Sequence, residues 1–307
     1  MGQVTRRELF TMGRNLAMGA AAVSILPRPL FGNAISLPVG IQLYEIRDQM
    51  AKDVPGSLKM LHDIGYREVE TASFGKYSAE DFGKLLEDAG LKAPSAHVRL
   101  SGDDLSAVFA NVHALGAKYA TSSSLATSNP RPAGVPPPNR PNRPILSQDD
   151  FMKLADQMNT IGKKAREAGL RYAYHNHNYE FVKMPNGKYG YDLLLEHTDH
   201  ELVKFEVDCG WMRMAGADPL VYFKKHPGRF KMLHVKEFKP TPSTTGINGA
   251  PTPEGTDLGS GFIDYTPIFV AAHKAGIEHA FSEQEDPFPV SSLESAKVDF
   301  KFLHEAK

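Results

Sequence analysis

A dense polar stretch near the middle of the chain constrains the fold more than any other feature. Residues Tyr174 to Phe181 hold two histidines, two asparagines and a glutamate, directly after Arg171-Tyr172-Ala173, which reads as the start of a strand. Side chains alternate between the faces of a strand, so His175 and His177 share one face, and Glu180 lies just past the strand end. Few structural needs explain so many ligand-type side chains together, and the stretch therefore indicates a functional site.

Three later segments repeat the pattern of an apolar strand that ends in a ligand-type residue, namely Asp208, His234 and Glu283. In a parallel barrel the carboxyl ends of the strands meet at one face, where the loops carry function. Histidine and carboxylate side chains from four successive strands are typical of a divalent-metal site. A single residue of this kind at a strand end is more often a buried polar group with a purely structural role. The occurrence of four of them at successive strand ends favours a metal site.

The rest of the chain alternates between strand and helix patterns. Strands are predicted at 39–44, 68–70, 93–98, 119–122, from 171 onward, up to Asp208, around His234 and at 279–283. Helices are predicted at 55–64, 78–89, 104–115, 149–168, 191–197, 219–225, 266–275 and 291–304. This order matches a single α/β domain of the (β/α)8 TIM-barrel type. An open doubly wound sheet is the rival fold, but no glycine-rich fingerprint follows the first strand.

Length and composition agree with one globular barrel preceded by a leader. The chain has 307 residues, of which 41% are hydrophobic and 23% are charged, and its formal net charge is -1. This balance gives no basic surface for nucleic acid. Cys209 is the only cysteine, so an intrachain disulfide is excluded.

The N-terminus predicts export. Thr5-Arg6-Arg7-Glu8-Leu9-Phe10 resembles a twin-arginine signal, an apolar run follows at 16–26, and small residues at 32–34 suit cleavage. We therefore expect a signal peptide at 1–34, a mature barrel at 35–307, passage through the Tat translocon and a periplasmic location. A cytoplasmic amphipathic helix is the alternative, but the run is uncharged. It is also too short to be a stable membrane anchor.

Two irregular segments interrupt the alternation, at 124–147 and 239–261. The first contains many prolines, which are excluded from ordinary helix and strand interiors. Because strands and helices resume unchanged behind it, we expect a long loop over the barrel mouth rather than a linker between domains.

In its strand-end residues and the motifs around them, the chain resembles the xylose isomerase-like barrel superfamily. Members of this superfamily are commonly called sugar phosphate isomerases/epimerases, and it includes endonuclease IV. The motifs that carry the resemblance are Gly40-Ile41-Gln42-Leu43-Tyr44 with Arg47, Gly65-Tyr66-Arg67-Glu68-Val69-Glu70, Tyr174 to Phe181, Val207-Asp208-Cys209-Gly210-Trp211, His234-Val235-Lys236-Glu237 and Ser282-Glu283-Gln284. They span essentially the whole chain after the leader. Endonuclease IV is the poorer match, because its additional histidine and aspartate ligands have no counterparts here.

The resemblance implies metal ligation by Asp208, His234 and Glu283. Ketose epimerases of the superfamily have a glutamate ligand on the fifth strand where the spacing here places His175. Either His175 binds the metal or Glu180 folds back to do so. One divalent ion, Mn²⁺, Co²⁺, Mg²⁺ or Zn²⁺, suits such a mixed set.

A metal at this place predicts chemistry next to a carbonyl group. It would stabilise an enediolate, while Glu180 or Glu283 moves protons and Lys236 contacts substrate oxygens or balances their charge. The alternatives are pure ligation for the two glutamates and solvent exposure for the lysine.

Six further residues are candidate substrate contacts, each with a structural alternative. They are Glu70 and His97 at the ends of the second and third strands, His177, Tyr44 and Arg47 after the first strand, and Trp211, whose ring suits a sugar face or the core.

The leading functional prediction is a metal-dependent isomerase or epimerase that acts on a carbohydrate through an enediolate. The same site would also serve a lyase or hydratase of 3-keto-glycosides by β-elimination, and export favours this alternative. A third hypothesis is a non-catalytic periplasmic sugar-binding barrel. No glycine-rich phosphate loop is present, and a homo-oligomer is compatible with the sequence.

Overall fold

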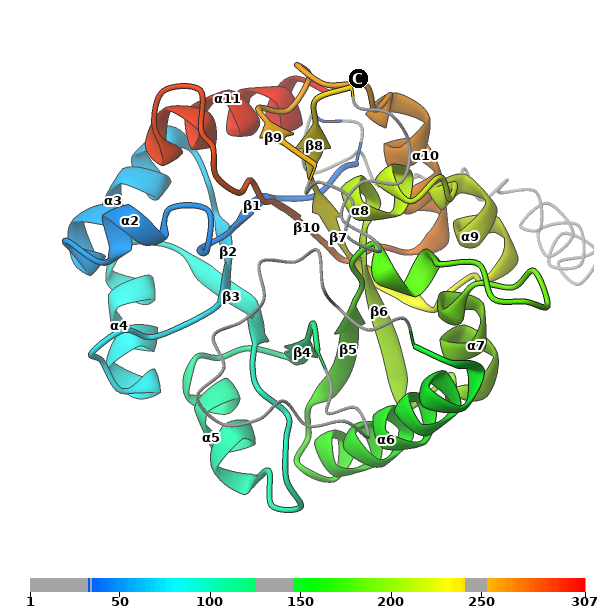
Figure 1. Ribbon diagram of the computed structural model, residues 1–307. Coiled ribbons are helices and arrows are strands. Elements are labelled where there is room, and N and C mark those ends of the chain that lie inside the picture. Colours follow the sequence, from blue (N-terminus) through cyan, green and yellow to red (C-terminus); the bar gives the residue numbers. More distant parts are fainter. Residues whose placement is uncertain (1–32, 34, 125–145, 241–252, 307) are drawn as a thin grey trace, which may run out of the picture. The chain divides into compact units, whose positions relative to one another are not determined.

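Eight parallel strands close into a barrel, and helices surround it (Figure 1). The computed structural model describes residues 33, 35–124, 146–240 and 253–306. The strands follow one another around the barrel in the order β1-β10-β7-β6-β5-β4-β3-β2. Because β1 pairs with both β2 and β10, the sheet has no open edge. The predicted (β/α)8 fold is confirmed, and an open doubly wound sheet is excluded.

The elements agree closely with the predicted alternation. The barrel strands are β1 (Val39–Gln42), β2 (Glu68–Thr71), β3 (Lys92–His97), β4 (Tyr119–Ser122), β5 (Arg171–His175), β6 (Val203–Asp208), β7 (Phe230–Val235) and β10 (His279–Ser282). The helices are α2 (Arg47–Met50), α3 (Val54–Ile64), α4 (Ala79–Asp88), α5 (Ser106–Ala114), α6 (Gln148–Glu167), α7 (Gly190–His197), α8 (Cys209–Met214), α9 (Pro219–Lys225), α10 (Tyr265–Ala275) and α11 (Ser292–Glu305).

Besides α2, four short elements near the strand ends were not predicted. A 3-10 helix, η2 (Tyr179–Phe181), follows β5, and α8 begins directly after Asp208. Beyond β7, β8 (Glu237–Phe238) pairs antiparallel with β9 (Gly255–Thr256). η2, α8 and β8 follow barrel strands at their carboxyl ends, and β9 pairs with β8, so these elements lie beside the candidate site.

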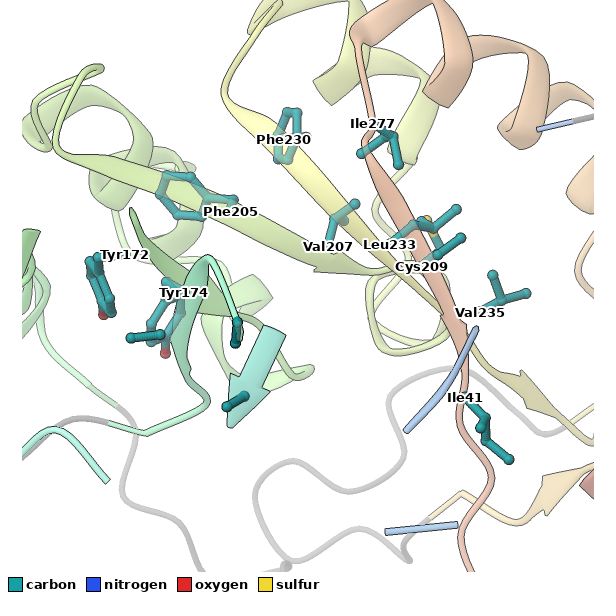
Figure 2. Close-up of a cluster of buried hydrophobic side chains, with 14 of the residues drawn as sticks. Ile41, Tyr172, Tyr174, Phe205, Val207, Cys209, Phe230, Leu233, Val235 and Ile277 are labelled. Carbon is teal, nitrogen blue, oxygen red and sulfur yellow. The ribbon is translucent and has the colours of Figure 1, made fainter. Parts of the chain in front are cut away.

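The strands separate two apolar layers. Their outward side chains, such as Tyr174, Phe205 and Val207, pack in the main core beneath the helices (Figure 2). Tyr119, Ala173, Met232 and Phe281 form a separate buried cluster. These four residues alternate in sequence with the outward ones, so they fill the barrel interior. The inward residues beyond them, toward the carboxyl ends, are polar and form the site.

Two predictions concern residues outside the described parts. The signal peptide falls almost entirely on residues 1–32 and 34, and most of the proline-rich segment falls on 125–145. Cleavage after residue 34 and a loop over the mouth therefore stay predictions. Within the described residues, none of the helices has both the length and the apolar character needed to span a membrane.

Candidate metal centre

The inward side chains at the carboxyl ends of the strands are polar and mostly buried. They are Glu70 on β2, His97 on β3, His175 on β5, Glu206 and Asp208 on β6, and His234 on β7, with Glu283 directly after β10. Strand alternation places them above the apolar cluster inside the barrel. The structure thus brings together the residues that the strand-end pattern singled out.

Four of these residues form what we call the outer group: His175, Asp208, His234 and Glu283. Each offers one ligand atom, and the four atoms lie within 4.8 Å of one another. His234 Nδ1 is 3.0 Å from Glu283 Oε2, and His175 Nε2 is 3.9 Å from Asp208 Oδ2. Two imidazoles and two carboxylates suit a borderline divalent cation such as Zn²⁺, Co²⁺ or Mn²⁺.

The Asp208 carboxylate supports this assignment. Its Oδ2 atom is buried and accepts no hydrogen bond from the described residues. Burial raises the pKa of Asp208 to about 7, against the opposing charge of Lys236. A cation bound by Oδ2 would supply the missing partner and offset the desolvation of the ionised form. The residues of the outer group therefore fit a metal ion.

The Asp208 side chain is fixed by the local sequence. Its Oδ1 atom caps α8 by accepting the backbone N–H of Trp211 at 2.8 Å. Gly210 allows this helix to begin against β7, because a Cβ at this position would lie 2.4 Å from the Lys236 carbonyl oxygen. With Oδ1 occupied by the cap, Oδ2 is the oxygen that remains for the outer group.

A second cluster, the inner group, consists of His97, His175, Glu206 and His234. Glu206 Oε2 lies 2.8 Å from His97 Nε2, 3.0 Å from His175 Nδ1 and 3.3 Å from His234 Nε2. The sequence pattern did not single out Glu206, although it shares a strand face with Asp208 two residues later. The two groups share His175 and His234.

Glu70 contacts two of the histidines. Its Oε2 atom accepts hydrogen bonds from Gln42 Nε2 and His234 Nε2, both at 2.8 Å, and lies 3.0 Å from His97 Nε2. The side chain is fully buried and bonded to Gln42 and His234, and the predicted substrate contact of Glu70 stays a prediction. Burial alone would lower the pKa of His97, but the charges of Glu70 and Glu206 outweigh it and raise that pKa to about 10.

Glu180 does not belong to either group. Its Oε1 atom accepts the hydroxyl of Tyr174 at 2.7 Å, and Oε2 accepts the backbone N–H of His177 at 3.0 Å. The side chain is fully buried within η2. Both of its oxygens thus hold the loop after β5, and the choice between His175 and Glu180 as the fifth-strand ligand stays a prediction.

Lys236 is buried, contrary to the alternative of solvent exposure. Its Nζ atom lies 2.9 Å from Glu283 Oε2 and 2.9 Å from Glu285 Oε1. It also lies 5.3 Å from the centre of the Trp211 ring. Trp211 is 2% exposed and packs on Phe238, so its ring supports the lysine and does not line the cavity at the barrel mouth.

This mouth cavity has a volume of about 320 Å³ and opens above the outer group. Its lining includes Gln42, Tyr44, Ala72, His97, Val98, Arg99, Ser123, Ser124, His175, His177, Glu283 and Glu285. The predicted contacts Tyr44, His97 and His177 thus face this space. Arg47 instead lies over the Tyr44 ring and pairs with Asp286, and it lines a neighbouring cavity. The mouth cavity has the size of a small-molecule site.

Comparison with known proteins decides the family. A model described as the xylose isomerase-like TIM barrel matches residues 58–303. The chain belongs to this family. Among its curated relatives is an inosose dehydratase from Lacticaseibacillus casei, 26% identical over 171 residues that cover 53% of this chain and 56% of the relative. The chain thus spans about half the length of the curated relatives it matches.

Solved structures of the family agree with the barrel. A sugar phosphate isomerase/epimerase from Parabacteroides distasonis is 27% identical, with a TM-score of 0.70 over 87% of this chain and 98% of the other. A xylose isomerase-like TIM barrel protein from Mycobacterium smegmatis, solved in complex with magnesium, is 15% identical, with a TM-score of 0.61 over 89% of this chain and 97% of the other. At that identity the magnesium-bound protein shows the shared fold alone.

Proposed function

We propose that this xylose isomerase-like barrel is a metal-dependent lyase that removes a proton next to a carbonyl of a carbohydrate and expels the β-oxygen substituent. The observation that carries the proposal is the buried ammonium of Lys236, 2.9 Å from both Glu283 and Glu285, beside a group that fits a metal. The similarity to inosose dehydratases supports it, since a dehydration is an elimination.

The outer group would hold the metal through His175, Asp208, His234 and Glu283. A bound divalent ion would act as a Lewis acid that polarises the substrate carbonyl and acidifies the neighbouring C–H bond. Because Glu283 belongs to this set, the Glu285 carboxylate is the better acceptor for the proton from carbon. Glu285 lines the mouth cavity and was missed in the sequence, where it alternates with Glu283.

Lys236 completes the reaction as the proton donor. As the Cα–H bond breaks, Glu285 takes the proton, the electron pair forms the C=C bond, and the C–O bond to the leaving group breaks. The ammonium of Lys236 protonates the departing oxygen as water or an alcohol. An acid and a base held side by side suit departure of both groups from one face of the substrate.

An isomerase or epimerase is the second candidate, favoured by the name of the Parabacteroides distasonis structure. It would begin with the same proton removal but return the proton to a neighbouring carbon or to the opposite face. The substrate in both cases is a small polyhydroxy ketone, and 3-keto-glycosides are the class we propose for the lyase. Export by the Tat route, with residues 1–34 as the signal, would bring the enzyme to such substrates in the periplasm.

Incubation of the zinc- or manganese-loaded protein with free ketoses and 3-keto-glycosides in D₂O, followed by NMR, tests the proposal. Release of the aglycone with formation of an unsaturated ketone supports the lyase. Deuterium next to the carbonyl without release supports the isomerase, and absence of both products overturns the two enzymatic candidates. Glu285→Gln is expected to keep the metal and lose turnover, whereas Glu283→Gln loses both.

A further inference from the structure

The inner and outer groups cannot both bind a metal ion through His175 and His234 at the same time if these histidines are neutral. They share His175 and His234, and a neutral imidazole has one lone pair and one N–H. The position of the proton on each ring therefore decides which group can bind an ion. The partners of the two rings show where these protons lie.

The Nδ1 atom of His175 is 3.0 Å from Glu206 Oε2. A carboxylate is an acceptor, so this contact places the ring proton on Nδ1. The Nε2 lone pair then faces the outer group, where it lies 3.9 Å from Asp208 Oδ2. The opposite tautomer would leave two lone-pair acceptors facing each other across 3.0 Å.

His234 has the reverse arrangement. Its Nε2 atom is 2.8 Å from Glu70 Oε2 and 3.3 Å from Glu206 Oε2, and its Nδ1 atom is 3.0 Å from Glu283 Oε2. All three contacts are with carboxylates, so the geometry alone would accept a proton at either end of the ring. A metal ion between Nδ1 and Glu283 would take the place of a proton there, and the proton that remains then lies on Nε2, between Glu70 and Glu206. The Nδ1 lone pair then faces the outer group, together with the Nε2 lone pair of His175.

We propose that Glu206, assisted by Glu70, is a positioning residue that sets opposite tautomers on His175 and His234, so that one metal ion binds in the outer group and the inner group stays a hydrogen-bonded support. Carboxylates behind histidine ligands commonly fix ring orientation in this way. The inference rests on the proposed metal site and is independent of the reaction that the site catalyses.

Glu206→Gln tests the role of the carboxylate. The amide retains the size of the side chain, but it presents an NH₂ group as well as an oxygen to the three ring nitrogens, so tautomer control is lost. Zinc affinity, measured by competition with a chromophoric chelator, is expected to fall about 10- to 100-fold with one equivalent still bound.

Glu68→Gln is the matched control. Glu68 Oε2 accepts from His279 Nδ1 at 2.8 Å, but this pair lies toward the amino ends of the strands, away from both groups. Zinc affinity is expected to stay at the wild-type value. Equal affinities of Glu206→Gln and the wild type would overturn the proposal, as would two bound equivalents in the wild type.

Nitrogen NMR of the histidine rings provides a test that needs no variant. In the zinc-loaded wild type, long-range ¹H–¹⁵N spectra should show two zinc-bound rings of opposite type, one bound through Nε2 and the other through Nδ1. An ion in the inner group would instead bind three rings, through His97 Nε2, His175 Nδ1 and His234 Nε2. Three zinc-bound rings would refute the role of Glu206, whatever reaction the protein catalyses.

Discussion

Asn176 holds the backbone of Asp208 from both sides. Its Oδ1 atom accepts the Asp208 N–H at 3.1 Å, and its Nδ2 atom donates to the Asp208 carbonyl oxygen at 3.2 Å. All of these groups are buried. The end of β6 is thereby joined to the residue that follows β5, and Asp208 is fixed relative to His175. The asparagine between the two histidines of the central stretch thus has a structural role in the site.

Loss of the two hydrogen bonds between Asn176 and the Asp208 backbone should lower the stability of the protein and its metal affinity together. Asn176→Ala leaves the Asp208 backbone groups without their partners, so we expect the free energy of unfolding to fall by about 1–3 kcal/mol. Zinc affinity should fall about tenfold, because the ligand is less well positioned. Denaturant unfolding of the metal-free protein and zinc titration measure the two effects.

Asn159→Ala is the matched control for Asn176→Ala. Asn159 also joins two backbone groups, donating to the His197 carbonyl oxygen at 3.0 Å and accepting the Asp199 N–H at 2.7 Å. It lies on α6, outside the barrel. This variant should lose stability without a change in zinc affinity, and an equal loss of affinity in both variants would contradict a specific effect at Asp208.

Removal of a predicted ligand should abolish metal binding and activity together. Asp208→Ala and His234→Ala each remove one atom of the outer group, and we expect stoichiometric zinc to be lost from both, as measured by metal analysis after dialysis. Asp218→Ala is the control for the capping role of Asp208, since Asp218 caps α9 by accepting the N–H of Leu220. It should retain the metal. Full metal content in both ligand variants would rule out the outer group.

Two variants distinguish between His175 and Glu180, the two candidates for the fifth-strand ligand. His175→Ala should lose the metal, because His175 belongs to both groups. Glu180→Gln should keep it, because Glu180 bonds to Tyr174 and to the backbone of His177. We expect the glutamine variant to be less stable by about 1–3 kcal/mol, since its amide cannot accept both bonds. Metal retained in His175→Ala and lost from Glu180→Gln would show that Glu180 is the ligand.

The fold and the proximity of the four outer-group residues could be predicted from the sequence for one physical reason. The apolar runs indicate buried parallel strands, and each run ends in a ligand-type residue, namely His175, Asp208, His234 or Glu283. Parallel strands in a closed barrel bring their carboxyl ends to one face, so linear order becomes proximity. The structure brings these four residues together, and their ligation of a metal stays a prediction.

The supporting residues were not accessible in the same way. Glu206 and Asn176 act through partners on other strands, and the register between β5 and β6 decides those contacts. The burial of Lys236 depends on Trp211 from α8, and that helix was not predicted. Glu180 was a metal candidate because of its chemistry, whereas its hydrogen bonds to Tyr174 and to the backbone of His177 depend on the fold of η2. Pairings of this kind depend on tertiary geometry that a linear pattern does not contain.

A buried carboxyl that is not part of the outer group predicts how stability depends on pH. Asp299 on α11 is 1% exposed, and its Oδ1 atom accepts the backbone N–H of Leu258 at 2.8 Å. Burial raises the pKa of Asp299 well above its usual range, and the charges of Asp257 and Glu237 raise it further. Folding therefore favours the protonated form.

The raised pKa of Asp299 determines the sign of the effect. An acid whose pKa is higher in the folded state contributes stability below its unfolded pKa of about 4, and this contribution is lost as the pH rises toward the folded value. Asp299→Asn retains an acceptor for the Leu258 N–H but cannot ionise. We expect the melting temperature of the variant, relative to the wild type, to increase from pH 5 to pH 8. Asp299→Ala lacks the acceptor and should be less stable than Asp299→Asn at every pH. A constant difference between Asp299→Asn and the wild type across this range would show that Asp299 has similar pKa values in the folded and unfolded states.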